Sequence, residues 1–317
     1  MTSSAPRPPV MLWACPGIGP EPWLAAFARE MPELDIRQWP DVGAAEEIDY
    51  AFAWKVPPGV LAGLPNLKAV FSLGAGVDSI IGADVVPAHL PLVRMVDPGL
   101  KLGMNEFVLM QALYYHREMP AFAAQQARRE WHERNVPLAS HRTVGVMGLG
   151  ELGRFCAENL ARVGFSVRGW ARSARDIPGV ACFHGPEGLG PFLSETEILV
   201  CLLPLTPESR GILNAQTFAR LPRGASLINA ARGGHLVDED LLAALESGHM
   251  AGATLDVFHV EPLPAEHPFW AHPRVIVMPH AAAPTQPETA APTVIEGIRR
   301  HRAGLPLLNV VDRALGY

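Results

Sequence analysis

Short apolar runs alternate with longer amphipathic stretches along the chain. The apolar runs predict β-strands at residues 10–14, 35–38, 50–54, 67–73 and 92–96, then at 144–146, in a run ending at Ala171, and at 198–203, 226–229, 253–257 and 275–278. The amphipathic stretches predict helices near residues 23–29, 104–117, 215–221, 239–246 and 288–300. Such alternation is typical of parallel sheets covered by helices. The pattern therefore predicts an α/β protein.

The same pattern falls into two halves. With 317 residues, 49% of them hydrophobic, the chain is long enough to form two cores. We expect residues 1–98 to form a flavodoxin-like, doubly wound domain to which the final helix returns, so that this domain also includes residues 288–317. Residues 99–287 are expected to form a second doubly wound domain with a Rossmann fold. Asp97-Pro98-Gly99 is interpreted as a hinge between the two.

A glycine motif in the second half indicates a dinucleotide site. The sequence Gly148-Leu149-Gly150-Glu151-Leu152-Gly153 follows an apolar strand and opens a helical run. The chain then returns to a strand within the ~30 residues of a βαβ unit. The first glycine of such a motif permits a tight turn, the second lets N–H groups approach a pyrophosphate, and the third lets helix and strand pack closely. These six residues are therefore candidate cofactor ligands.

The end of the next strand indicates which cofactor is bound. NAD sites usually place Asp or Glu about 20 residues beyond the motif, where it binds the ribose 2′-OH. This chain has Ala171 there, followed by Arg172 and Ser173. A guanidinium binds a 2′-phosphate with two hydrogen bonds, and a hydroxyl donates a further one. We therefore expect NADP, with NADPH preferred over NADH; the alternative is a solvated turn at a strand end.

Composition argues against several other classes of protein. The 26 basic and 32 acidic side chains give a net charge of −6 without long charge runs, so neither nucleic acid nor an anionic membrane is an expected partner. No signal peptide and no apolar run of about 18 residues is evident. The four cysteines are scattered and never form a C-x-x-C pair. We therefore expect buried thiols in the cytoplasm, with neither a disulfide framework nor a metal site.

Three polar residues of the second half each follow a predicted strand: Arg232, Glu261 and His280. Because the carboxyl ends of parallel strands converge on one crevice, we expect the three to meet there. Taken singly, they have plainer interpretations as a surface charge, a turn carboxylate and a hydrogen-bonded loop imidazole. In the first half, a glycine-rich loop at residues 74–78 follows a strand directly. Its N–H groups suit a carboxylate, although an ordinary turn is equally compatible.

Together these motifs resemble the D-2-hydroxyacid dehydrogenase family. Within it the chain is most similar to the bacterial glyoxylate/hydroxypyruvate reductase A type. The segments that carry this similarity are LGAGVDSI at 73–80, DLLAAL at 240–245, DVF with EPLP between 256 and 264, and VDRALGY at 311–317. The resemblance spans essentially the whole chain and implies an NAD(P)-dependent oxidoreductase acting on 2-keto acids.

The resemblance also implies roles that acid–base chemistry supports. His280 would be the general acid and base, Glu261 would stabilise its imidazolium, and Arg232 would bind the substrate carboxylate and polarise the carbonyl. A carboxylate partner fits proton transfer and argues against the formate dehydrogenases, which pair the histidine with an amide. The substrate carboxylate would also be bound by N–H groups of Ala75, Gly76 and Val77. Further implied cofactor neighbours are Leu203, Pro204, Ala230, Arg232, Asp256 and His280.

The prediction of substrate size depends on Trp54, which lies at the end of a predicted strand. This side chain could close the pocket around glyoxylate or hydroxypyruvate, or it could be a core tryptophan. The favoured function is NADPH-dependent reduction of such small 2-keto acids. The alternatives are a dehydrogenase for a larger acid such as phenylpyruvate, and a dinucleotide-sensing binding protein resembling the corepressor branch of the family. His116, His235 and His259 match no motif and are expected to be structural.

We also expect a homodimer. The Arg-rich stretch 125–134 is interpreted as a solvated surface helix. Its Trp131 is a candidate for a subunit interface, because exposed aromatic residues are enriched there.

Overall fold

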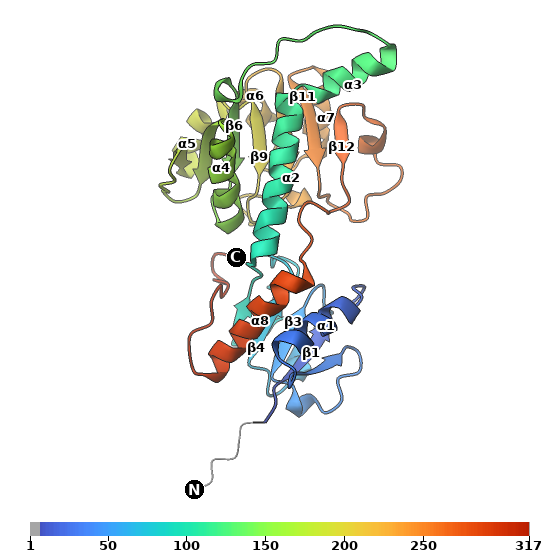
Figure 1. Cartoon of the computed structure of the whole chain (residues 1–317), viewed down its shortest axis with the longest axis vertical. Coiled ribbons are helices and arrows are strands. Elements are labelled where there is room, and N and C mark those ends of the chain that lie inside the picture. Colours follow the sequence, from blue (N-terminus) through green and yellow to red (C-terminus); the bar gives the residue numbers. More distant parts are fainter. Residues whose placement is uncertain (1–6, 317) are drawn as a thin grey trace. The chain divides into compact units, whose positions relative to one another are not determined.

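The structure, a computed structural model, describes residues 7–316 and divides into two compact units (Figure 1). One unit contains the chain up to Leu100 together with the chain from Thr285 onward, and the other contains Lys101–Pro284. Each unit is built on one parallel sheet, of five and seven strands respectively. The α/β class with two parallel-sheet domains is therefore confirmed.

The first unit has the strand order β2-β1-β3-β4-β5. These strands are β1 (Val10–Ala14), β2 (Asp35–Gln38), β3 (Tyr50–Ala53), β4 (Ala69–Ser72) and β5 (Leu92–Val93). All neighbouring pairs are parallel. Two helices of this unit, α1 (Glu21–Glu30) and α8 (Pro287–Arg302), pack against each other. The last helix of the chain thus belongs to the unit in which the chain begins.

Aromatic side chains cover the sheet face beneath these helices. Trp13, Phe52 and Phe71 lie in one register row across β1, β3 and β4, so their side chains point to the same face. The ring of Trp23 on α1 lies 5.1 Å from that of Phe52. On α8, a Cβ at Gly297 would come within 2.5 Å of the Phe71 ring, so glycine is what allows this helix to approach the sheet.

Arg313, in the C-terminal VDRALGY segment, has a structural role. Its guanidinium donates hydrogen bonds of 2.9 to 3.3 Å to the carbonyl oxygens of Ile81, Val86, Pro87 and Leu90. Only a side chain with several donors in a planar fork can serve four carbonyls at once. The C-terminal segment is thereby fastened to the loop that precedes β5.

The second unit has the strand order β12-β11-β10-β9-β6-β7-β8. These strands are β6 (Thr143–Met147), β7 (Ser166–Ala171), β8 (Val180–His184), β9 (Ile198–Cys201), β10 (Ala225–Asn229), β11 (Met250–Leu255) and β12 (Val275–Val277). One face packs on α2 (Pro98–His116) and α4 (Glu151–Val163). The other packs on α5 (Gly185–Leu193), α6 (Ala215–Arg220) and α7 (Asp238–Glu246). The strand order reverses direction at β6, where doubly wound sheets bind their ligands.

The prediction that the helix starts near residue 104 is wrong, because α2 already begins at Pro98. The hinge at Asp97-Pro98-Gly99 stays a prediction. The Asp97 carboxylate accepts hydrogen bonds of 2.9 and 3.2 Å from the N–H groups of Gly99 and Leu100. An aspartate cap followed by proline at the first helical position is a favourable helix start, because proline lacks the N–H that would go unpaired there. Asp97-Pro98 therefore marks the N-terminus of α2.

One further prediction needs correction, and one pair of elements was not predicted. The polar stretch 125–134 is not one helix, since α3 (Met119–Arg128) ends inside it and residues 129–138 are irregular. Gln125, on that stretch, is buried rather than solvated. The hydrophobic pattern did not lead to a prediction of β8 or α5.

Candidate functional site

The predicted site residues of the second unit follow the carboxyl ends of its strands. β10 leads to Arg232, β11 to Glu261 and β12 to His280, and these three strands are neighbours in the sheet. β6 leads to the glycine motif, β7 to Arg172, and β9 to Leu203 and Pro204. Because all strands are parallel, these loops share one edge of the sheet.

Glu261 and His280 are joined directly. Oε2 of Glu261 lies 2.9 Å from Nδ1 of His280. The other carboxylate oxygen accepts a hydrogen bond of 3.1 Å from the N–H of Phe258, which fixes the carboxylate. Both side chains are partly exposed, at 26% for Glu261 and 39% for His280. The pair combines a carboxylate-oriented imidazole with access from outside, as a group that exchanges protons with a ligand needs.

Asp256 holds the loop that carries His280. The backbone of His280 has φ of 54°, a left-handed conformation that is uncommon for residues other than glycine. Its N–H donates to the Asp256 carbonyl at 2.9 Å, and the Asp256 carboxylate accepts from the N–H groups of Ala281 and Ala282 at 2.7 and 3.0 Å. Burial raises the pKa of the Asp256 carboxyl, and these two N–H groups oppose the rise. Asp256 therefore stabilises the conformation that presents His280.

The loop that carries Glu261 is anchored on both sides of it. The carboxylate of Asp238, at the start of α7, lies 3.6 Å from Nε2 of His259 and 3.4 Å from Nε2 of His267. Burial raises the pKa of Asp238, and the two imidazoles oppose that rise. The Trp270 indole also donates to the carbonyl of Pro264 at 2.9 Å. Asp238 and His267 were not predicted from the sequence, because an acidic residue before an apolar run looks like an ordinary helix start.

The Arg232 turn is shaped by a buried amide and a glycine. Asn229 is fully buried, and its side chain accepts from the N–H of Ala231 at 3.2 Å and donates to the Arg232 carbonyl at 3.3 Å. A Cβ at Gly233 would lie 1.9 Å from the carbonyl carbon of Phe258, a backbone atom that cannot move aside. Glycine is therefore required for the Arg232 turn to pack against the loop that carries Glu261.

The glycine motif fits the approach of a dinucleotide. Gly148 has φ of 98°, and a Cβ at Gly153 would lie 1.7 Å from the Gly148 carbonyl oxygen, so the turn and α4 are in direct backbone contact. At Gly150, by contrast, a Cβ would meet nothing within 4 Å. This glycine precedes α4, which starts at Glu151 without a side-chain cap. The helix N-terminus thus keeps N–H groups that an anionic ligand can accept from. The flanking Leu149 points into the core.

Arg172 and Ser173 are both exposed at the end of β7. Glu208, after β9, has its pKa lowered chiefly by a hydrogen bond from Thr206 and also by the charge of Arg172. Pro204, in the same loop as Glu208, accepts a hydrogen bond of 2.7 Å from the Ser209 hydroxyl through its carbonyl. The predicted phosphate ligand therefore lies within electrostatic reach of the loop predicted to line the cofactor.

In the first unit, the loop at residues 74–78 follows β4 and is held from both sides. Thr285 donates through its hydroxyl to the Leu73 carbonyl at 2.9 Å, and the N–H of Met95 donates to the Gly74 carbonyl at 3.2 Å. Within residues 7–316, the N–H groups of Ala75, Gly76 and Val77 donate to no protein acceptor. Three consecutive N–H donors of this kind form the backbone nests that bind carboxylates.

Trp54 packs against the same loop. A Cβ at Gly74 would come within 2.7 Å of the Trp54 ring, so glycine lets the indole lie on the loop. Trp54 is half-buried, whereas Trp13 and Trp23 of the same unit are 3% and 4% exposed. Its environment is thus that of a loop-covering side chain rather than of a core tryptophan.

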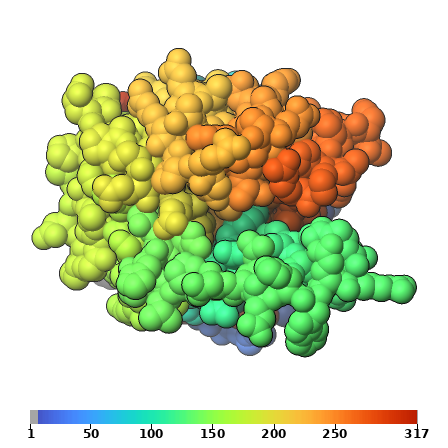
Figure 2. Space-filling model, turned by 90° about the horizontal axis from the view of Figure 1, so that it is seen from above, coloured from blue at the N-terminus to red at the C-terminus, as the bar shows by residue number. Residues whose placement is uncertain are grey.

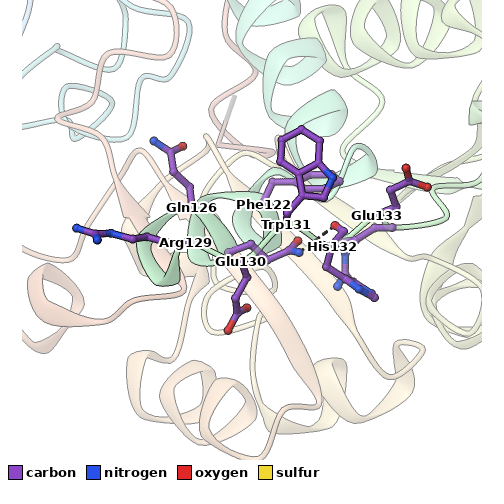
Figure 3. A pocket seen from close by; sticks show the side chains of 9 residues that line it. Phe122, Gln126, Arg129, Glu130, Trp131, His132 and Glu133 are labelled. Carbon is purple, nitrogen blue, oxygen red and sulfur yellow. Dashed lines mark hydrogen bonds between the residues drawn. The ribbon is translucent and has the colours of Figure 1, made fainter.

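A separate pocket of about 730 Å³ lies on α3 and the segment that follows it (Figure 3). Phe122, Gln126 and Trp131 are among the side chains that line it, and none of the strand-end residues takes part. Over the part of the chain that the structure describes, no cluster of three or more His, Cys, Asp or Glu side chains is arranged to hold a metal ion. Among those same residues, no helix has the length and apolar character to span a bilayer.

Known proteins with similar sequences match nearly the whole chain. Residues 109–282 match the sequence model described as "D-isomer specific 2-hydroxyacid dehydrogenase, NAD binding domain". The chain is 44% identical to glyoxylate/hydroxypyruvate reductase A of Yersinia enterocolitica over 304 residues, which cover 93% of this chain and 96% of that protein. It is also 44% identical to the Serratia proteamaculans protein of the same name over 307 residues, which cover 95% of this chain and 98% of that one.

Solved structures of proteins from the same family are also similar to this chain. A D-isomer specific 2-hydroxyacid dehydrogenase from Xanthobacter autotrophicus, in complex with NADPH and MES, is similar at a TM-score of 0.94 and 46% identity, covering 98% of this chain and 99% of that one. An NADPH-dependent glyoxylate/hydroxypyruvate reductase from Sinorhizobium meliloti, in complex with NADP and sulfate, is similar at a TM-score of 0.91 and 42% identity, covering 98% and 100%.

Proposed function

Because the chain belongs to the family of D-isomer specific 2-hydroxyacid dehydrogenases, we propose that it reduces small 2-keto acids such as glyoxylate and hydroxypyruvate with NADPH. The observation that carries the proposal is the 2.9 Å contact between Glu261 and His280, on the sheet edge that also presents the glycine motif. A carboxylate-oriented imidazole beside a dinucleotide turn is what reversible reduction of a carbonyl requires. The names of relatives 44% identical to this chain support the substrate class.

The chemistry follows from three residues. Reduction needs a hydride at the carbonyl carbon, a proton at the carbonyl oxygen and a cation beside the carboxylate. NADPH supplies the hydride when bound. His280 donates the proton from Nε2, since its Nδ1 faces Glu261, and takes a proton back in the reverse direction. Glu261 stabilises the imidazolium and fixes its tautomer. Arg232 binds the carboxylate and polarises the carbonyl.

The cofactor residues are assigned on the same edge of the sheet. The open space at Gly150 and the N-terminus of α4 suit the pyrophosphate, and Arg172 with Ser173 suits the 2′-phosphate. The expectation of NADP agrees with the NADP and NADPH bound in the two solved relatives. The other residues that we assign to the cofactor site are Leu149, Glu151, Leu152, Leu203, Pro204, Ala230, Arg232, Asp256 and His280.

We assign substrate binding to the first unit and cofactor binding to the second. The N–H groups of Ala75, Gly76 and Val77 would donate hydrogen bonds to the substrate carboxylate. Trp54, which lies on this loop, would limit the length of the substrate side chain. Contact between an indole and a small acid leaves no room for an aromatic ring at the same place.

Substrate length tests the role of Trp54. Trp54→Ala should raise the ratio of kcat/KM for phenylpyruvate to that for glyoxylate by about 10-fold or more, because pocket shape discriminates apolar groups by 10- to 200-fold. Trp39→Ala, which removes another half-buried tryptophan of the same unit, is the matched control and should leave the ratio unchanged. An unchanged ratio in Trp54→Ala would show that Trp54 does not set substrate size.

The function itself is tested by a matrix of substrates and cofactors. Oxidation of NADPH and NADH is followed with glyoxylate, hydroxypyruvate, pyruvate and phenylpyruvate in one buffer at one pH. Fast turnover of the two small acids with NADPH supports the proposal. Preference for phenylpyruvate would keep the mechanism and favour a larger substrate, whereas no turnover with any acid would favour a dinucleotide-binding protein without catalysis.

We further propose that the protein is a homodimer through its α2–α3 segment. Large apolar side chains are exposed along residues 102–138, with Trp131 at 98%, Leu138 at 72%, Met110 at 52% and Leu102 at 51%. The later part of this segment, green in Figure 2, runs over the outside of its unit. Large exposed apolar side chains gathered on one segment favour an interaction site. A second copy of the chain is the partner that would bury it.

Mass measurement by light scattering tests the interface. Trp131→Glu should shift the protein from dimer toward monomer, because it places a charge where an aromatic side chain would be buried. Leu308→Glu alters an apolar side chain that is 55% exposed in the other unit and should leave the mass unchanged. A dimer that survives Trp131→Glu at micromolar concentration would place the interface elsewhere.

The cysteines fit the reducing cytoplasm, where we place the protein. All four are free thiols. Burial raises the pKa of Cys156 and of Cys201 to about 12, so these thiols stay protonated and unreactive.

A further inference from the structure

His235 lies between the two turns that flank the proposed site. Its side chain is fully buried. Nδ1 lies 3.1 Å from the Arg232 carbonyl oxygen, and Nε2 lies 3.2 Å from the Pro204 carbonyl oxygen. One imidazole therefore bridges the turn after β10, which carries Arg232, and the turn after β9, which lies on the cofactor side.

Main-chain hydrogen bonds hold the backbone beyond this bridge. The N–H of Gly211 donates to the Gly234 carbonyl at 2.9 Å, and that of Leu213 donates to the His235 carbonyl at 2.8 Å. Residues 234–236 thus run beside residues 211–213 through main-chain hydrogen bonds. The imidazole of His235 connects the Arg232 turn directly to the Pro204 turn. The side chain of His235 adds a link to the part of the turn nearest the guanidinium of Arg232.

The chemistry of the bridge is specific to a side chain with two separated polar atoms. Both partners are carbonyl oxygens, which only accept hydrogen bonds, so each tautomer of a neutral imidazole donates to one of them. The neutral ring therefore makes one of the two hydrogen bonds at a time, while its rigid width separates the two carbonyls. An apolar residue of similar size would remove this connection between the two turns, although each carbonyl keeps another donor, Asn229 for Arg232 and Ser209 for Pro204.

We propose that His235 is a positioning residue for Arg232. It fixes the Arg232 turn relative to the Pro204 turn. In this way it sets the position of the Arg232 guanidinium, which binds the keto acid, relative to the bound cofactor. The proposal rests on the proposed function, because it assigns His235 an effect on the substrate cation of that site. Shifts of about 1 Å in such a group cost up to about 10²-fold in rate.

The test compares His235→Ala with a histidine that makes the same kind of bond elsewhere. His249 is bound through Nε2 to the Phe218 carbonyl at 2.7 Å, outside the site, so His249→Ala is the matched control. We expect His235→Ala to lower kcat/KM for glyoxylate about 10- to 100-fold with a raised KM, while His249→Ala stays within about 2-fold. His235→Gln, whose amide reaches one carbonyl, should recover part of the loss.

A cycle with Arg232→Lys separates positioning from general loss of stability. If His235 acts through Arg232, adding His235→Ala to Arg232→Lys should lower kcat/KM much less than it does in the wild type. Equal losses in both backgrounds, or unchanged constants in a folded His235→Ala variant, would overturn the proposal. Should His235→Ala not fold, the same cycle is run with His235→Gln.

Binding of NADPH distinguishes this proposal from the proposed function. Wild-type turnover of glyoxylate tests the function alone. A fluorescence titration with NADPH tests the bridge even without turnover, since loss of the contact to Pro204 should raise the NADPH Kd of His235→Ala several-fold and leave that of His249→Ala unchanged. An unaltered Kd in His235→Ala would contradict the bridge irrespective of activity.

Discussion

Replacing His280 with asparagine should lower kcat for glyoxylate reduction by about 10³-fold, within the range that positioned acid–base groups contribute. The amide nitrogen of asparagine takes the place of Nδ1 and can keep the hydrogen bond to Glu261, which is 2.9 Å long in the native protein. Nε2, which donates the proton in the proposed mechanism, is absent. NADPH affinity should change by no more than about 3-fold, because the glycine motif and Arg172 are untouched. Steady-state kinetics and NADPH fluorescence titration measure the two effects.

Glu261→Gln is the companion to this variant. It keeps the shape of the pair but removes the charge that favours the imidazolium. We expect it to retain more activity than His280→Asn, because the imidazole that donates the proton is still present. A purified His280→Asn protein that reduces glyoxylate at the wild-type rate would contradict the role of His280.

The strands that position this chemistry were predictable because parallel strands buried on both faces are nearly continuous apolar runs. β1 and β2 begin and end where the sequence places them. The helix α5 was not predictable in this way, because Gly185, Gly188, Gly190 and Pro191 all disfavour a helix. It forms because Phe192 and Leu193 are buried in the core of the unit, so packing overrides propensity. β8 is an edge strand without a fully buried residue, but Val180–Phe183 is an apolar run, so this strand could have been predicted and was missed.

The residues of the site also separate into those that the sequence predicts and those that it does not. Arg232, Glu261 and His280 were found because they follow strand ends and belong to a motif set that resembles one family. The structure places Glu261 and His280 in contact. His235 and Asp238 were not found, since their functions depend on carbonyls and imidazoles that are distant in sequence. Residues that orient a site through backbone contacts leave no periodic or compositional signal.

Arg172→Ala should weaken NADPH binding by about 30-fold and NADH binding by no more than about 2-fold. A hydrogen bond to a charged group contributes about 1.5 to 3 kcal/mol to binding. Only NADPH carries the 2′-phosphate that Arg172 would bind. Arg172 is exposed at the end of β7, so part of the effect should fall with salt, because exposed charges are screened. Dissociation constants for both cofactors at low and high salt measure the difference.

Two neighbouring side chains sharpen this prediction. Arg175→Ala removes an equally exposed arginine from the same loop and should leave the ratio of the two dissociation constants unchanged. Glu208 lies within electrostatic reach of Arg172, so Glu208→Gln removes a negative charge that opposes the phosphate and should tighten NADPH binding about 2-fold. Equal losses for NADPH and NADH in Arg172→Ala would mean that this arginine stabilises the loop rather than the phosphate. If Arg175→Ala weakens NADPH binding more than Arg172→Ala does, Arg175 would be the residue that binds the 2′-phosphate.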